Sequence, residues 1–269
     1  MCKSVRQHEY FGESDMVEGI HNTSRLINDC RTRGVVKFPK LVRAIECLAG
    51  HGSISQLDIL CEDILNAVMD NPASVEAVWH PLGFMYIELL QKYGTSVRFH
   101  IWSAKFPQRT SLGWLIHKHS WGLSSYLMLG SLKNHVYEIA SSADPPSSRI
   151  YRVGYQGLTN HLVATGNLVS HNLAVTQKVS KGSIYRLAPG IFHRTEVARN
   201  SDVATFVLAE DAAGQRNEVL GETDGARLYT MTRPRCSHEE IRQAAGIILK
   251  DRERMPRSPN RSEPTHADD

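Results

Sequence analysis

Two histidines stand one residue apart in the stretch "LIHKHSWGLSSYLMLGS", residues 115–131. On a β-strand, residues i and i+2 project from the same face, so His117 and His119 would lie side by side with Leu115. The leucine indicates that this face points inward. Two imidazoles packed inside a protein are costly unless a ligand uses their lone pairs, and a divalent metal ion does so. The alternative is an exposed strand whose Ile116 points inward while both histidines face water.

A third histidine follows a turn in "GSIYRLAPGIFHRTEV", residues 182–197. Pro189 and Gly190 predict a tight turn, and His193 comes three residues later on the next expected strand. A histidine just past such a turn lies at the rim of a barrel, from which it can point inward. The alternative is a surface histidine on a hairpin.

Taken together, the two stretches resemble the cupin superfamily over about residues 83–210. The first cupin motif corresponds to Gly113, His117, His119 and Gly130, and the second to Gly182, Pro189, Gly190 and His193. The resemblance implies a jelly-roll barrel that holds one metal ion on His117, His119 and His193. Cupins often pair through edge strands, so the resemblance also allows a homodimer.

The usual fourth cupin ligand is missing. In most cupins it is a glutamate four or five residues after the second histidine, and Leu123 and Ser124 stand there in this sequence. A set of three neutral imidazoles resembles the thiol dioxygenase branch, the cysteine dioxygenase family. That resemblance implies Fe(II) as the cofactor and dioxygen as a co-substrate. Three open positions on an octahedral ion let substrate and dioxygen bind together.

The substrate apparatus of that branch is absent. The family binds its substrate carboxylate through an arginine in the strand before the motifs, and the comparable stretch "GFMYIELL" has none. The cysteine cross-link position of the family falls at Ser124, and its Ser-His-Tyr relay would fall in "VATFVLAED", which lacks His and Tyr. We therefore expect the metal site to be kept, and we do not carry over cysteine as the substrate.

Three further residues are candidates for catalytic roles. Tyr185 would reach a ligand bound to the metal, and Arg98 or Arg186 would clamp a substrate carboxylate, since a guanidinium binds carboxylate bidentately. The alternatives are an ordinary strand tyrosine and two surface arginines. His100 and His171 also lie in stretches of sequence that predict strands. Each is a partner of the metal ligands, a replacement ligand or an ordinary strand residue.

These residues support an oxygenase hypothesis. An ion without a carboxylate ligand keeps more positive charge, which favours a small anionic substrate of thiol or amino-acid type. One alternative is isomerase or lyase chemistry, in which the ion acts only as a Lewis acid. Another is a cupin-like binding module without catalysis. Motifs for nucleotide binding (GxGxxG, GKS/T) and for serine hydrolysis (GxSxG) are absent from the sequence.

The surrounding sequence predicts the elements that position these residues. Residues 1–35 are polar and predict a flexible arm. Residues 36–82 predict a helical layer, with apolar residues at helical spacing in "FPKLVRAIECLAGHG" and "SISQLDILCEDILNAVMDNP" and a third short helix in "PASVEAVWH". Over 83–210, short β-like runs separated by turn formers predict a mostly β protein with a cupin-type jelly-roll barrel.

The C-terminal part is expected to add one helix. Residues 211–255 form an extension in which Ser237 and Glu240 have the spacing of a capping box, and 256–269 predict a disordered tail.

Composition limits the class of protein. The chain has 41% apolar and 22% charged residues, and its net charge of +3 is too weak to indicate nucleic-acid binding. Five widely spaced cysteines without a CxxC pair suit reduced thiols. No secretory signal and no apolar run near the length of a membrane span occur. We therefore expect a soluble cytoplasmic enzyme without nucleic-acid or membrane partners.

Overall fold

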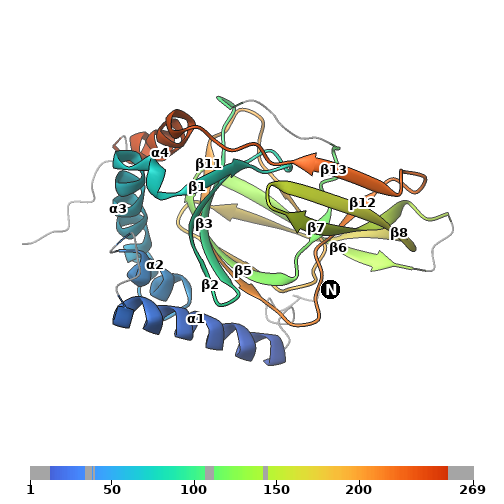
Figure 1. Cartoon of the computed structure of the whole chain (residues 1–269), viewed down its shortest axis with the longest axis horizontal. Helices are drawn as coiled ribbons and strands as arrows, with labels where there is room; N and C mark the ends of the chain where they lie inside the picture. Colours follow the sequence, from blue (N-terminus) through green and yellow to red (C-terminus); the bar gives the residue numbers. More distant parts are fainter. Residues whose placement is uncertain (1–12, 34–37, 39, 107–111, 142–144, 254–269) are drawn as a thin grey trace, which may run out of the picture.

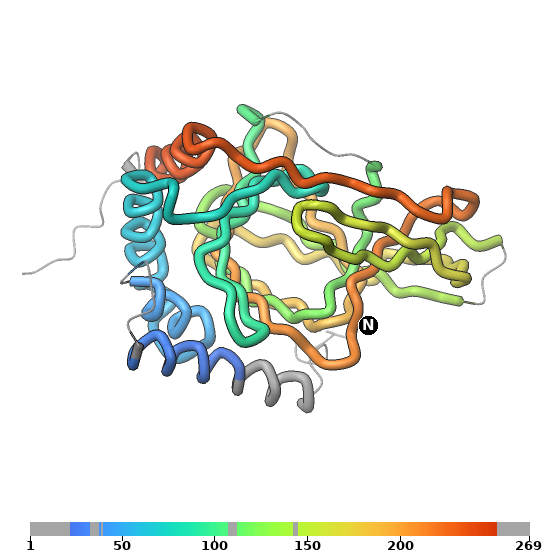
Figure 2. Tube along the Cα trace, in the orientation of Figure 1, coloured from blue at the N-terminus to red at the C-terminus, as the bar shows by residue number. Residues whose placement is uncertain are grey.

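Two antiparallel sheets wrap around a common interior, and helices pack on one side of them (Figures 1 and 2). The computed structural model describes residues 13–33, 38, 40–106, 112–141 and 145–253. In spatial order the first sheet contains β1 (Glu76–Trp79), β2 (Met85–Lys92), β3 (Thr95–Trp102), β11 (Val203–Asp211), β5 (Trp121–Leu129) and β9 (Ile184–Leu187). The second contains β13 (Leu228–Thr232), β8 (Thr159–Ser180), β6 (Ser131–Ala140), β10 (His193–Glu196), β4 (His117–Lys118), β12 (Glu218–Gly221) and β7 (Ser148–Gln156).

Eight of these strands pair in a nested order. β3 pairs with β11, β4 with β10, β5 with β9 and β6 with β8, all antiparallel. The first of the eight thus pairs with the last, the second with the last but one, and so on inward. The successive pairs alternate between the sheets: β3–β11 and β5–β9 lie in the first sheet, and β4–β10 and β6–β8 lie in the second. This nested pairing is the jelly-roll arrangement. The predicted fold class, a mostly β jelly roll with N-terminal helices and a C-terminal helix, is therefore confirmed.

Two expected elements differ from the structure. Residues 159–180, where separate short β-like runs are expected, form one continuous strand, β8, because its first half pairs with β7 and its second half with β6. The third helix expected in "PASVEAVWH" is wrong. Pro72–Ser74 forms one turn of 3-10 helix, and β1 follows. β1 pairs with β2 on one side and with the chain around Pro234 and Cys236 on the other, and Trp79 is buried to 2% exposure in the cluster shared with the helices.

The helices form a layer on the outer face of the first sheet (Figure 1). They are α1 (Glu13–Arg33), α2 (Leu41–Leu48), α3 (Leu57–Asp70) and α4 (His238–Glu253), with short 3-10 turns at Ile54–Gln56 and Pro72–Ser74. Leu41, Ile45 and Ile64 are almost fully buried against the sheet, as the helical spacing predicts. Within the described residues, no helix combines the length and apolar character needed to cross a membrane.

The arm expected over residues 1–35 needs correction where the structure describes it. Glu13–Arg33 is helical, and Leu26 is completely buried in the core shared with the sheet. Lys92 forms an ion pair with Asp29, which fastens α1 to the hairpin of β2 and β3. The sequence is polar enough to resemble an arm because only a narrow apolar stripe, which includes Leu26, Ile27 and Cys30, faces the protein. Residues 1–12 and 256–269 lie outside the described residues.

The capping box expected at the start of α4 is confirmed. The backbone N–H of Ser237 donates to Oε2 of Glu240 at 2.7 Å, and the backbone N–H of Glu240 donates to Oγ of Ser237 at 3.2 Å. This reciprocal pair satisfies donors that the first helical turn leaves without partners.

The sheets also take in β1, β12 and β13, which lie outside the range 83–210 expected for the barrel.

Alternation along the strands of the first sheet decides where polar residues go. In β3, Val97, Phe99 and Ile101 are fully buried under the helices. The alternate residues Arg98, His100 and Trp102 face the interior between the sheets, where they line a cavity. The apolar face of β3 thus serves the helix–sheet core, and its polar face is left for the barrel interior.

Gly130 joins β5 to β6 at a point where no side chain fits. Its φ is +75°, and a Cβ atom there would lie 2.4 Å from the backbone oxygen of Asp202. Gly130→Ala is therefore expected to lower the free energy of unfolding by more than about 1 kcal/mol in urea denaturation. Gly166→Ala is the control, since a Cβ at Gly166 meets nothing within 4 Å, and its effect should stay within about 0.5 kcal/mol. Equal effects of the two changes would contradict this account.

Candidate metal centre

The structure brings together the three histidines that the sequence predicts as metal ligands. His117 begins β4, His119 follows that strand, and His193 begins β10. β4 and β10 are antiparallel neighbours, with His117 and His193 directly opposite each other. One nitrogen from each ring lies within 4.8 Å of the others. Leu115 lines the same cavity, while Ile116 packs in a separate apolar cluster, so the face that carries the histidines is the inward one.

Hydrogen bonds to the backbone fix the tautomers of two rings. Nδ1 of His117 lies 2.8 Å from the carbonyl oxygen of Leu115, and Nδ1 of His193 lies 3.0 Å from that of Ile191. A carbonyl oxygen only accepts, so Nδ1 carries the proton and donates in both cases. The lone pair of Nε2 is then free, as in metal-binding histidines whose other nitrogen is held by a carbonyl.

The three imidazoles are neutral in this environment. Burial lowers the pKa of His193 to about 3, with a further lowering by His117 and an opposing effect of the hydrogen bond to Ile191. Burial also lowers the pKa of His117, and it lowers that of His119 well below the usual range, where His117 and His193 add to the effect. The neutral form is the one that binds a metal ion.

The cluster fits a divalent ion. Imidazole nitrogens bind such ions at about 2.1 Å, which sets neighbouring ligand nitrogens about 3–3.5 Å apart, so a small inward rotation of the rings closes the site. The cluster contains three imidazoles and no carboxylate among the described residues. Leu123, one of the two positions of the usual cupin glutamate, lines the cavity with an apolar side chain. The ring of His119 stacks on Trp121, with centroids 3.7 Å apart at 12°.

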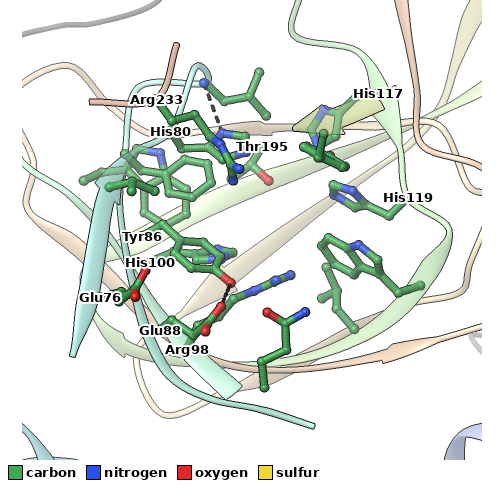
Figure 3. A pocket seen from close by; sticks show the side chains of 18 of the residues that line it. Glu76, His80, Tyr86, Glu88, Arg98, His100, His117, His119, Thr195 and Arg233 are labelled. Atoms are coloured by element: carbon green, nitrogen blue, oxygen red, sulfur yellow. Dashed lines mark hydrogen bonds between the residues drawn. The ribbon is translucent and has the colours of Figure 1, made fainter. Parts of the chain in front are cut away.

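The three histidines lie on the wall of a cavity of about 490 Å³ (Figure 3). The opposite wall carries His80, Tyr86, Glu88, Arg98 and His100, which come from β2, β3 and the turn before β2. The volume is within the range of small-molecule sites. The cavity therefore joins a set of metal ligands from the second sheet to polar side chains from the first.

Arg98 is placed in this cavity, as one of the two expected arginines. It is 7% exposed, its guanidinium lies 4.3 Å from the ring centroid of Trp121, and Nη1 donates to Oγ of Ser96 at 3.1 Å. Its Nε is buried without a hydrogen-bond partner. No carboxylate of the described residues lies within ion-pair distance of it. The chemistry of a buried guanidinium in this state suits the binding of an anion.

Of the other two candidates for catalytic roles, Tyr185 lies inside the cavity and Arg186 lies outside it. Tyr185 lines the cavity at 5% exposure, and burial raises the pKa of its hydroxyl. Arg186 is exposed and is not part of the cavity wall. Alternation along β9 explains the difference, because Tyr185 and Leu187 point inward and the residue between them points out. The expectation that Arg186 serves the site is therefore corrected.

His80 is a site residue that the sequence reasoning missed. It was assigned to the end of a helix, whereas it follows β1 in the turn to β2. Glu76, Val78 and His80 all line the cavity, and the intervening Ala77 and Trp79 are buried in the core with the helices. A period of two in "EAVWH" was the available signal. His100 also lines the cavity, while His171 contacts Ser147 and Ser148 away from it.

Comparison with known proteins adds little to this geometry. No protein-family model and no curated protein matches the chain. Among solved structures, it is similar to the ligand-free L-ribose isomerase of Cellulomonas parahominis, at 12% identity and a TM-score of 0.27, over 89% of this chain and 96% of that one. At this level the fold rests on the strand pairing, and the site rests on its own geometry. Both agree with the resemblance to cupins.

Replacing any one of the three histidines with alanine is expected to abolish tight metal binding. Loss of a residue that merely orients a ligand costs about 10–100-fold in metal affinity, so loss of a ligand costs at least as much. Titration of metal-free protein with Co(II), followed by absorption and elemental analysis, measures the effect. His51→Ala is the matched control, because His51 is exposed and is not part of the cavity wall. Wild-type affinity in the His193→Ala variant would refute the site.

Proposed function

We propose that the protein is a mononuclear non-haem iron oxygenase that acts on a small anionic substrate. The observation that carries the proposal is the pairing of three neutral imidazoles, without a carboxylate, with an unpaired buried arginine in one cavity. His117, His119 and His193 would hold Fe(II). When bound, the ion would supply open coordination positions and electrons for dioxygen chemistry.

The protein's own residues bind and orient the substrate. The guanidinium of Arg98 receives the anionic group, since charge-assisted hydrogen bonds to a buried arginine are strong and directional. Trp121 packs between Arg98 and His119 and so sets the distance between the anion site and the metal ligands. Phe84 and Trp102 form an apolar part of the wall, with ring centroids 4.8 Å apart, which limits water in the cavity.

A second candidate is a metal-dependent isomerase or lyase. One observation favours it: Tyr86 donates a hydrogen bond to Oε2 of Glu88 at 3.0 Å on the cavity wall, and burial raises the pKa of Tyr86. A tyrosine and a carboxylate in contact are suited to proton transfer to and from a substrate. In that reaction the ion would act as a Lewis acid, and dioxygen would not be consumed.

Oxygen dependence separates the two candidates. Protein loaded with Fe(II) without air is offered a panel of small carboxylic, amino and thiol acids, and oxygen uptake and product formation are followed with and without dioxygen. We expect turnover to consume oxygen and to cease under argon, and to be lost in His119→Ala. Equal turnover under argon would support the isomerase or lyase. Protein that binds no iron would end the oxygenase proposal, and protein that binds no divalent ion would end both.

Arg98→Met is expected to raise the KM of the anionic substrate by at least about tenfold. A hydrogen bond to a charged group contributes about 1.5–3 kcal/mol, and methionine keeps the apolar stem without the charge. Iron content should stay at the wild-type level, since Arg98 is not a ligand. Arg186→Met is the matched control, because that arginine faces solvent on the outside of β9. An unchanged KM in Arg98→Met would remove Arg98 from the substrate site.

A further inference from the structure

We propose that His80 and Arg233 form a second anion-binding subsite in addition to Arg98, so that the cavity takes a substrate with two anionic oxygen groups, as in a small dicarboxylate. The inference deepens the proposed function and rests on it for the reaction, although binding of the diacid itself needs only the protein. Arg98 would bind one end of the molecule, and His80 with Arg233 would bind the other.

The turn between β1 and β2 holds the ring of His80 in one orientation. The backbone N–H of His80 donates to the carbonyl oxygen of Phe84 at 2.8 Å, and that of Gly83 donates to the carbonyl oxygen of His80 at 2.9 Å. The imidazole stacks on the ring of Phe84, with centroids 4.4 Å apart at 11°. A ring fixed by its neighbours loses little freedom when a ligand binds.

The same turn also determines which nitrogen of His80 carries the proton. The backbone N–H of Leu82 donates to Nδ1 of His80 at 3.2 Å, a contact drawn as a dashed line in Figure 3. Nδ1 is therefore the acceptor, and in the neutral ring Nε2 carries the proton. His80 lines the cavity, and no acceptor among the described residues forms a hydrogen bond with Nε2. His80 therefore has the opposite tautomer to His117 and His193, whose Nε2 atoms keep a lone pair that can bind a metal.

Arg233 lies beside His80 at the cavity wall (Figure 3). Nη2 donates to the carbonyl oxygen of Gly157 at 2.7 Å, and the guanidinium lies 5.4 Å from the ring centroid of Tyr155. These contacts hold the side chain but leave its charge without a counter-ion in the described part of the chain. Its Nε is buried with no hydrogen-bond partner.

Two carboxylates on this wall already accept hydrogen bonds, whereas several donors have no acceptor. Glu88 accepts from Tyr86, and Glu76 accepts from Arg235 at 3.5 Å. The Nε atoms of Arg98 and Arg233 are buried without an acceptor, and Nε2–H of His80 lies at the cavity wall without one. A buried donor without an acceptor costs about 1–3 kcal/mol, so the two arginine donors, together with the histidine donor beside Arg233, favour a ligand rich in oxygen atoms.

The two arginines also lie close enough to serve one small molecule. Both are near enough to His80 for their charges to act on its ring, and both act in the same way on Tyr155. They reach the cavity from different segments, Arg98 from β3 and Arg233 from the chain after β13. Two separate cationic groups, one of them with a neutral donor beside it, are complementary to two carboxylates joined by a short chain.

Competition between a diacid and a monoacid of similar length tests the inference on metal-free protein. Calorimetric titration of the wild type with succinate and with butyrate should give at least about tenfold tighter binding of succinate, since one charge-assisted hydrogen bond contributes about 1.5–3 kcal/mol. His80→Phe keeps the stacked ring without the donor, and Arg233→Met keeps the stem without the charge. Each should reduce the preference for succinate at least about fivefold while butyrate binding stays unchanged.

His161→Phe is the control, because His161 lies on β8, contacts Thr230 and is not part of the cavity wall. Arg98→Met should weaken both acids. Succinate that binds no better than butyrate to the wild type, no binding of either acid, or equal losses for both acids in His80→Phe and Arg233→Met would overturn the subsite. Iron content, measured on separate samples of the same variants after loading with Fe(II), reports separately on the proposed function, because neither His80 nor Arg233 is among the three clustered histidines.

Discussion

The first sheet is covered on both faces: its outer face is apolar throughout, whereas its inner face is apolar along β5, β9 and β11 and largely polar along β2 and β3. Val97, Phe99 and Phe206 pack under the helices in the largest apolar cluster of the described residues. Burial of this surface supplies the main stabilising free energy. The inner face does not have to be apolar for the sheet to hold together. The barrel interior can therefore contain charged and hydrogen-bonding side chains at a cost that the helix–sheet core offsets.

That freedom explains the chemistry of the cavity. Three arginines, two glutamates and five histidines line it, and burial together with the neighbouring positive charges keeps His80, His100 and the three clustered histidines neutral. A cavity with this balance of charge favours ligands that bring electron pairs or negative charge. A divalent ion would add still more positive charge, and this strengthens the preference for an anionic substrate.

Much of the fold and the core of the site were predictable from the sequence. The two histidine motifs have fixed spacing, and the turns that frame them contain Pro189, Gly190 and Gly130, whose backbone geometry is specific. Elements with mixed signals were less predictable. In α1 only a narrow apolar stripe marks the buried face, and β1 reads equally well as a short helix because Trp79 and Val78 suit both.

The direction in which each face of a strand points was the other feature that could not be predicted from the sequence. A period of two shows that Arg98 and Arg186 each lie opposite apolar neighbours, but it does not show which face is covered. In β3 the helices cover the apolar face, so the arginine points into the barrel. In β9 the apolar residues point into the barrel, so the arginine points to water. Only the tertiary arrangement, with helices on one sheet, distinguishes the two cases.

The two sheets divide the work of the site between them. The metal ligands belong to the second sheet, on β4, just after it and on β10, while Arg98 and His80 belong to the first sheet or its turn. A ligand that contacts both sets must bridge the barrel interior. The two sets are fastened by different backbone contacts, His117 and His193 by the carbonyls of the residues two before them and His80 by the turn at Gly83. Separate residues on a shared framework would therefore set metal affinity and substrate affinity, with Trp121 of the first sheet as the contact that joins His119 to Arg98.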